Sequence, residues 1–146
     1  HSLTTNQVKS PEPILVNNRV VVTRMHTEDV LWCDFSELCL KPRSPADFIE
    51  IANTFNTVLV SHIPHLNDHL ADGTRRFIYL VDEFYDRRVK LILTSEDSII
   101  QLYKGERLAF EIERTRSRLL EMQSEDYLNT EHRLNESTNP TQRELI

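Results

Sequence analysis

Two spacings of apolar residues alternate along this chain, and the changes of spacing mark the predicted elements. In residues 72–86 the apolar side chains recur every three or four positions, as on one face of a helix. They are Phe77, Leu80, Val81 and Phe84. Residues 89–93 then form a continuous apolar run, which is typical of a strand buried on both sides. A helix that leads straight into such a strand predicts half of an α/β unit.

The same patterns continue towards the N-terminus. Two β-branched runs flank Asn17-Asn18. Because asparagine tolerates the positive φ of a tight turn, they predict an antiparallel hairpin. Further strands are predicted at residues 30–35 and 57–64, and a helix is predicted between them at residues 45–55, with Pro45 in its first position.

Two more helices are predicted towards the C-terminus. A short one follows Ser95, and a long one covers residues 108–128. The long helix has one regularly spaced face made of Leu108, Ile112, Thr115, Leu119 and Met122. Hydroxyl side chains are expected to cap the starts of the predicted helices by accepting bonds from free backbone N–H groups. These caps are Ser36, Ser44, Thr74 and Ser95.

The alternation of strands and helices predicts one α/β domain at residues 13–128. We expect a mainly parallel sheet flanked by helices, with the hairpin at its N-terminal end. This layering is like that of a P-loop NTPase but without the P-loop. Residues 1–12 are polar and predict a flexible segment or linker, and residues 129–146 predict a mobile polar tail.

Composition narrows the classes of partner. The net charge of −6 argues against nucleic acid, because broad binding to nucleic acid depends on a basic surface. No apolar run is long enough to span a bilayer, so no transmembrane segment is expected. Cys33 and Cys39 match no common metal spacing and are predicted to be reduced thiols, which favours a cytoplasmic location.

Glycine content excludes a phosphate-binding loop within these residues. A P-loop requires the pattern GxxxxGK[ST], in which backbone N–H groups approach phosphate closely. The chain has two glycines, Gly73 and Gly105, and neither lies in such a pattern. A dinucleotide-binding fingerprint is absent for the same reason. We therefore predict no cofactor and no nucleotide hydrolysis for this chain alone.

Polar clusters give no clear catalytic or metal site. His65 and His69 are four residues apart, but turn residues surround them, so we predict a solvated loop. Ser61 and His62 are neighbours on a strand and point to opposite faces, so they are not expected to act on each other. Asp82 and Asp86 are predicted to share a helix face with Tyr79, where they face water or pair with Arg75.

The arginines of the last helix are the strongest candidate for ligand contact. Arg114 and Arg118 lie one helical turn apart and repel each other unless an anion lies between them. Glu111 and Glu121 are placed to supply that charge, which predicts a salt-bridged surface. The alternative is that Arg114, Arg116 and Arg118 contact phosphate or an acidic partner, because the arginine fork suits both.

Three long segments resemble one protein family. They are VLWCDFSELCLKPRSPADFIEIANTFNTVLVSHIP, RRFIYLVDEFYDRRVKLILTS and LYKGERLAFEIERTRSRLLEMQSEDYL. Together they resemble the C-terminal part of the AFG-like, or ZapE-type, AAA+ ATPases, a family with a bacterial member in cell division. The resemblance covers residues 20–128. In that family the ATP-binding motifs lie upstream of the matching segment.

The resemblance implies an ATPase parent that uses ATP and Mg²⁺, with this chain as a C-terminal domain without catalysis of its own. It implies a role in assembly, substrate engagement or nucleotide sensing. Expected partners are the upstream ATPase core, the tubulin-like division-ring protein and, in the parent, other copies of itself. The matching positions are Arg75, Arg76, Asp82, Glu83, Tyr85, Asp86, Arg114, Thr115, Ser117, Arg118, Met122, Gln123 and Ser124.

Two other functions remain open on the sequence. The chain is alternatively a stand-alone adaptor that binds an acidic protein or phosphate. An independent hydrolase is the least favoured function, because no nucleophile lies beside a base.

Overall fold

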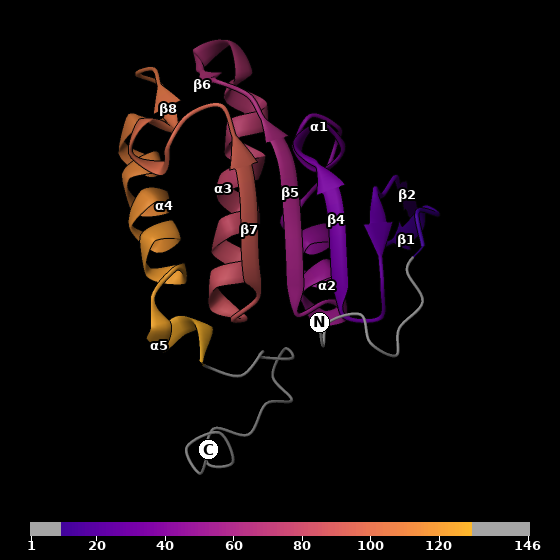
Figure 1. Ribbon diagram of the computed structural model, residues 1–146. Coiled ribbons are helices and arrows are strands. Elements are labelled where there is room, and N and C mark those ends of the chain that lie inside the picture. The colour runs from indigo at the N-terminus through magenta and orange to yellow at the C-terminus, as the bar shows by residue number, and fades with distance from the viewer. Residues whose placement is uncertain (1–9, 130–146) are drawn as a thin grey trace.

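A computed structural model describes residues 10–129, and these form a layered α/β domain (Figure 1). The strands are β1 (Ile14–Val16), β2 (Arg19–Val21), β3 (Met25–His26), β4 (Val30–Asp34), β5 (Thr57–Ile63), β6 (Leu66–Asn67), β7 (Lys90–Ser95) and β8 (Tyr103–Lys104). The helices are α1 (Phe35–Cys39), α2 (Pro45–Thr54), α3 (Ala71–Asp86), α4 (Ala109–Met122) and α5 (Glu125–Leu128), with short 3₁₀ turns η2 (Asp68–Leu70) and η3 (Ile99–Gln101).

The main sheet confirms the predicted fold class. Its strand order is β3-β4-β5-β7, in which β4, β5 and β7 run parallel and β3 pairs antiparallel with β4. The predicted hairpin is present as β1 and β2, and Asn17 and Asn18 have the positive φ values of 52° and 68° that its turn requires. The predicted flexible N-terminal segment lies largely outside the described residues, as does the tail after residue 129.

One face of the sheet forms the hydrophobic core. Leu31 and Cys33 of β4 and Val58 and Val60 of β5 are fully buried on this face. The predicted apolar stripe of α3 packs in the same core, with Phe77, Leu80, Val81 and Phe84 all inaccessible to solvent. In Figure 1, α2 and α3 lie behind the sheet and supply this cover.

Helix α2 begins as predicted, and its cap ties it to the hairpin. Ser44 precedes the helix, and Pro45 occupies its first turn. The carboxylate of Asp47 accepts a hydrogen bond from the backbone N–H of Ser44 at 3.0 Å. It also accepts one from the Asn17 amide at 3.0 Å and pairs with Arg19 at 3.2 Å. Asp47 therefore joins the hairpin turn to the start of the helix.

The other predicted caps are wrong. Helix α3 begins at Ala71, so Thr74 lies inside it, and its hydroxyl donates to the Leu70 carbonyl at 2.8 Å. Helix α1 begins at Phe35, which places Ser36 within the helix. Ser95 is the last residue of β7, and Ser98 precedes η3 instead.

Three predicted segments differ from the structure. Residues 65–73 are not a solvated loop: they form β6, η2 and the start of α3, and Leu66 is buried. The β7 strand is not buried on both sides, because Ile92 is 49% exposed. The predicted long C-terminal helix is divided into α4 and α5.

Two further features of the described residues concern membrane spans and the cysteines. No helix in residues 10–129 combines the length and the apolar character that crossing a membrane requires. Cys33 and Cys39 are both free and buried, which confirms that they are thiols rather than a disulfide. Burial raises the pKa of Cys33 to about 12 and also raises the pKa of Cys39. Both thiols are therefore protonated and unreactive in the folded chain.

Removing the Asp47 carboxylate should destabilise the domain. We expect Asp47→Ala to lower the free energy of unfolding by about 1–2 kcal/mol, because it removes a helix cap and two contacts to the hairpin turn. Urea unfolding measures this change. Glu50→Ala, at an exposed position on the same helix, is the matched control and should change it little. Equal effects of the two substitutions would contradict the role given to Asp47.

Candidate functional site

A polar cluster lies at the carboxyl ends of the parallel strands. Asp34 ends β4, and Ser61 and His62 lie near the end of β5. One oxygen of Asp34, Oδ1, accepts from Arg24 Nε at 2.7 Å and from Ser61 Oγ at 2.7 Å. The same oxygen lies 2.8 Å from His62 Nδ1. Ligands of α/β proteins often bind at this edge of a sheet, so we call these four residues the strand-end cluster.

A local irregularity in β5 places His62 in the cluster. The pairing of β5 with β7 shifts between Val60 and Ile63, and His62 has a positive φ of 61°. The backbone N–H of His62 consequently donates to Thr94 Oγ1 at 3.1 Å rather than to a β7 carbonyl. Positive φ is uncommon for a residue with a side chain and costs free energy. The contact between His62 Nδ1 and Asp34 Oδ1 offsets part of this cost.

The strand-end cluster also holds Trp32. The indole Nε1 of Trp32 donates to Ser61 Oγ at 3.0 Å, and the Arg24 guanidinium lies 5.8 Å from the centre of the Trp32 ring. Ser61 therefore accepts from Trp32 and donates to Asp34, and His62 does not activate it. The prediction that Ser61 and His62 point to opposite faces is wrong, because the positive φ of His62 lets both side chains reach Asp34 Oδ1.

Electrostatics keep Asp34 ionised. The Arg24 guanidinium, with smaller help from Ser61 and His62, holds the pKa of the Asp34 carboxyl well below its usual range. The imidazole of His62 is largely exposed, at 69% of its side chain, and the carboxylate fixes its orientation. The cluster can therefore present an oriented imidazole and a paired arginine to a bound surface.

The guanidinium groups of Arg114 and Arg118 are paired with an acidic residue from another helix. Asp82 of α3 lies 3.4 Å from Arg114 and 2.5 Å from Arg118, so one carboxylate bridges both guanidiniums. Glu111 and Glu121 were expected to do this, and Asp82 was expected to face water or pair with Arg75. Both expectations are wrong, because α3 and α4 pack side by side and bring Asp82 closer. Arg116 points elsewhere, pairing with Glu113 and donating to the Tyr103 carbonyl at 3.0 Å.

Aromatic rings extend this interface into α5. The Arg118 guanidinium lies 4.9 Å from the centre of the Tyr85 ring, and Tyr85 stacks on Tyr127 with ring centres 6.0 Å apart. Arg88 lies over both rings, at 5.3 and 5.1 Å. The Tyr127 hydroxyl is shared between the carbonyls of Phe84 and Val89. These contacts fix α4 and α5 against α3.

The remaining family-motif positions divide into packed and exposed residues. Thr115 and Met122 are buried, and Arg76 donates to the Cys39 carbonyl at 3.0 Å. Glu83 pairs with Arg87 at 2.6 Å, and Ser124 Oγ accepts from the Tyr127 N–H at 3.2 Å. The exposed positions are Arg75, Asp86, Ser117 and Gln123.

The side chain of His65 pairs with acidic residues. His65 pairs with Asp97 at 2.8 Å and with Glu96 at 2.7 Å. Asp68, which lies between His65 and His69 in sequence, accepts bonds from the Tyr103 hydroxyl and from the backbone N–H groups of Glu106 and Arg107. Within residues 10–129, no group of three or more potential ligand side chains is arranged to hold a metal ion.

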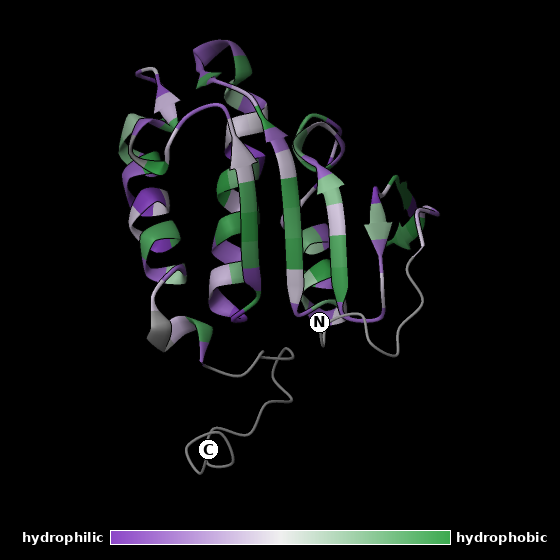
Figure 2. Ribbon diagram, in the orientation of Figure 1, coloured by the Kyte–Doolittle hydropathy of each residue, from purple (hydrophilic) through white to green (hydrophobic). Residues whose placement is uncertain are grey.

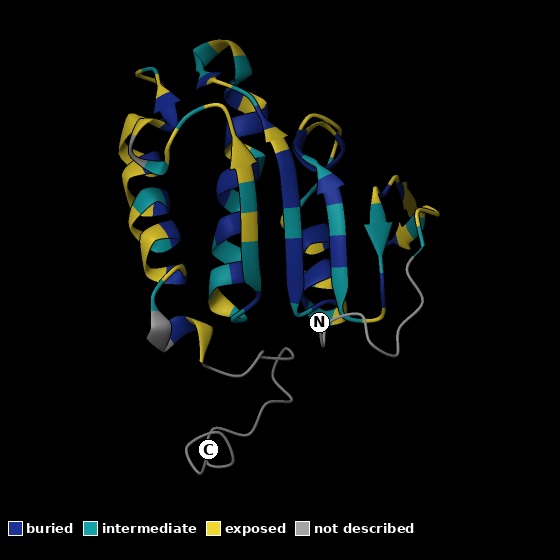
Figure 3. Ribbon diagram, viewed as in Figure 1, coloured by how far each residue is buried: buried dark blue, intermediate teal, exposed yellow. Residues whose placement is uncertain are grey.

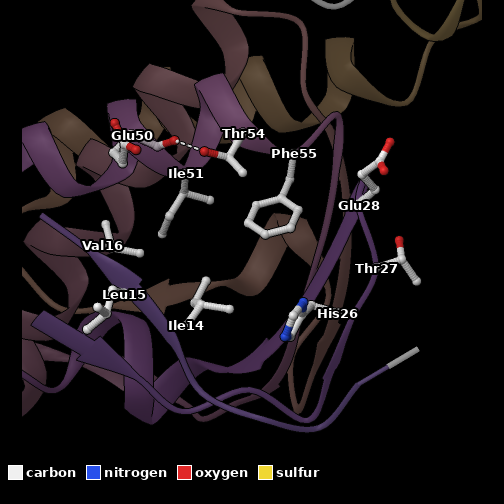
Figure 4. Close-up of a pocket in the computed structure, with 10 residues that line it drawn as sticks. All are labelled: Ile14, Leu15, Val16, His26, Thr27, Glu28, Glu50, Ile51, Thr54 and Phe55. Carbon is white, nitrogen blue, oxygen red and sulfur yellow. Dashed lines mark hydrogen bonds between the residues drawn. The ribbon is translucent and has the colours of Figure 1, made fainter. Parts of the chain in front are cut away.

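An apolar cavity of about 310 Å³ lies between the hairpin and α2 (Figure 4). Figure 4 shows Ile14, Ile51 and Phe55 around it, and Thr54 bonded to the Glu50 carbonyl at 2.9 Å. Ligand sites combine such apolar walls with a few convergent polar groups. The Thr54 hydroxyl is already used within the helix, and the polar residues His26, Glu28 and Glu50 also line the cavity.

Sequence reasoning missed Arg24, Trp32 and Asp34. The available signal was positional: Asp34 and Ser61 lie near the ends of predicted strands, and the carboxyl ends of parallel strands meet at one edge. Arg24 had no such signal, because it lies in the irregular segment between β2 and β3.

Comparison with known proteins gives one family. The AFG1-like ATPase family matches residues 1–131. The cell division protein ZapE of Escherichia coli K12 is 42% identical over 117 residues, which are 80% of this chain and 31% of ZapE. The lactation elevated protein 1 homolog B of Danio rerio is 32% identical over 117 residues, 80% of this chain and 23% of that protein. The chain spans less than a third of the length of either relative. No solved structure matches it.

The bridge between α3 and α4 should contribute measurably to stability. We expect Asp82→Asn to lower the free energy of unfolding by about 1 kcal/mol, because two guanidiniums lose their shared partner. Asp86→Asn removes the same charge from an exposed position on the same helix and is the control. A double-mutant cycle with Arg118→Gln should give a coupling of about 0.5–1 kcal/mol. Additive effects would show that the bridge contributes nothing.

The strand-end cluster should make stability depend on acidity. Because folding lowers the pKa of Asp34, its carboxylate stabilises the fold above the unperturbed value of about 3.9. That contribution is lost as pH falls towards the folded pKa. We expect the difference in unfolding free energy between wild type and Asp34→Asn to shrink as pH falls below about 4.

The cause of this dependence can be tested separately. In Arg24→Gln the carboxyl of Asp34 should titrate at higher pH by NMR, because its strongest partner is gone. An unchanged Asp34 titration would remove Arg24 as the cause.

Proposed function

Because this chain belongs to the AFG1-like ATPase family, we propose that it is one module of a larger ATPase and does not hydrolyse ATP itself. Its role is to dock against the nucleotide-binding part and help it assemble or engage substrate. The observation that carries this proposal is the use of both glycines in packed positions, which leaves no loop for a triphosphate.

The surroundings of the two glycines support this. Gly73 lies inside α3 where it crosses α1, and a Cβ added there would come within 2.7 Å of Leu40 Cδ2. Gly105 lies against Asp68, and a Cβ there would come within 2.5 Å of the carboxylate oxygen Oδ1. The first glycine serves helix packing. The second faces an anion, which would repel phosphate.

ATP and Mg²⁺ do not fit the described residues. Backbone N–H groups that cradle phosphate need a glycine-rich turn, and Mg²⁺ needs oxygen ligands gathered in one place. Neither feature occurs in residues 10–129. We therefore assign ATP and Mg²⁺ to the part of the parent protein that this chain does not contain.

The relatives suggest the setting of the parent. One of them is named a cell division protein, so we propose that the parent acts in cell division on the cytoplasmic side. The tubulin-like division-ring protein is the proposed partner, and the parent is proposed to form a homo-oligomer. Arg114 keeps 64% of its side chain exposed beyond its contact with Asp82. It is therefore the arginine best placed to reach a nucleotide on a neighbouring copy.

A titration distinguishes this function from the alternatives. We expect the isolated chain to show no ATP turnover and no stoichiometric heat of binding with MgATP, because it has no triphosphate site. The full-length protein should hydrolyse ATP under the same conditions. Calorimetry and phosphate release measure the two properties.

Three results would contradict the proposal or redirect it. Stoichiometric MgATP binding by the isolated chain would overturn it. Binding of inorganic phosphate or an acidic peptide by a chain that also functions without an ATPase partner would favour the adaptor. Hydrolysis by the isolated chain would favour an independent enzyme.

A further inference from the structure

The main sheet is covered by helices on one face only. Helices α2 and α3 lie behind β4, β5 and β7 in Figure 1, and no helix passes in front of these strands within the described residues. Helix α4 contributes to the same covered side, because its Leu119 and Met122 line a hollow with Leu91 and Leu93 of β7. In Figure 3, β7 carries only the colours of exposed and intermediate residues.

The open face carries an apolar row. Strand pairing places Met25 opposite Trp32, Trp32 opposite Leu59 and Leu59 opposite Ile92. Directly paired residues point to the same side of a sheet, so these four side chains form one line across it. The first three are partly exposed, and Ile92 is 49% exposed. Figure 2 shows hydrophobic colour along the middle of β4, β5 and β7.

Such a face is unusual for parallel strands. Parallel sheets occur almost only where both faces are covered, and their strands read as continuous apolar runs for that reason. The sequence of β7 has this character, with Leu91, Ile92 and Leu93 in succession. The structure partly buries Leu91 and Leu93 against the core and leaves Ile92 exposed. The sequence is therefore suited to a cover that residues 10–129 do not supply.

The course of the chain indicates which part of the parent protein covers the open face. The chain spans less than a third of its relatives, so most of the parent lies outside it. Ser10, the first described residue, pairs with His26 through two backbone hydrogen bonds of 2.9 and 2.7 Å. The upstream chain therefore arrives at the β3 edge, beside Met25. The nine preceding residues span at most about 30 Å, which reaches across the open face.

We propose that the open sheet face, defined by Met25, Trp32, Leu59 and Ile92, is the surface on which the upstream part of the parent ATPase docks. The proposal rests on the proposed function, because it assumes that the chain is a module of a longer protein. The face has the anatomy of a protein interface. Its centre is apolar and contains a tryptophan, which is a frequent hot-spot residue.

Polar residues border the open face at both the amino and the carboxyl ends of its strands. Lys90 lies at the amino end of β7, and the strand-end cluster with Arg24 and His62 lies at the carboxyl ends. These groups give the docked segment a fixed orientation, since charged rims favour one register over others. The strand-end cluster thereby gains a role as an interface contact rather than a catalytic group.

The test is thiol accessibility in the full-length protein. Ile92→Cys places a reporter on the open face, and Leu120→Cys places one on α4 at nearly the same exposure, 52% against 49% in this structure. Tryptic peptides 91–104 and 119–133 separate the two sites, so mass spectrometry follows labelling by iodoacetamide at each position. Thr94→Cys, also exposed on the open face, is a second reporter in case Ile92→Cys fails to fold.

We expect position 92 to label at least about tenfold more slowly than position 120 in the native full-length protein, and equally fast in urea. Equal native rates would overturn the proposal. Protection of position 92 that disappears on dilution would also overturn it, because a second copy rather than the upstream segment would then be the cover.

The outcome is separable from that of the proposed function. Equal labelling together with ATP turnover confined to the full-length protein would reject only this docking surface. Slow labelling at position 92 together with ATP turnover by the isolated chain would reject only the proposed function.

Discussion

Burial of one face of three parallel strands is the constraint on which the rest of this structure depends. Leu31 and Val58 close the centre of the covered face, and the aromatic stripe of α3 packs on it. Burying side chains of this size stabilises the fold by about 1.5–3 kcal/mol each, far more than any surface ion pair here. The strand-end cluster and the Asp82 bridge follow from this packing, because the strands and α3 carry their acidic residues.

The ion pairs and aromatic stacks depend on that packing. Once α3 and α4 lie side by side, Asp82 is closer to Arg114 and Arg118 than any acid on their own helix. Tyr85 and Tyr127 then join α5 to the same interface. Two of the three segments that resemble the family, residues 75–95 and 102–128, build this interface. Several residues of these segments therefore have packing roles in this structure.

Local signals predicted much of the fold. The hairpin followed from Asn17-Asn18, and the start of α2 followed from Ser44-Pro45, because these signals act within a few residues. The caps at Ser36 and Thr74 failed for a tertiary reason. Packing of α1 and α3 extends both helices towards their N-termini, and the hydroxyl of Thr74 bonds inside the helix. The strand-end cluster escaped prediction because its members lie in three separate segments.

The sequence by itself determined the α/β class, the hairpin, the stripe of α3 and the lack of a GxxxxGK[ST] pattern in this chain. Each of these depends on residues close together in the sequence, or on a composition too poor in glycine to build a phosphate cradle. Only the tertiary structure decided that Asp82 bridges two arginines, that Asp34 gathers Arg24, Ser61 and His62, and that one face of the sheet is open. An apolar run indicates that a strand is suited to burial. Which side is covered depends on the elements that pack there, and those lie elsewhere in the chain or beyond it.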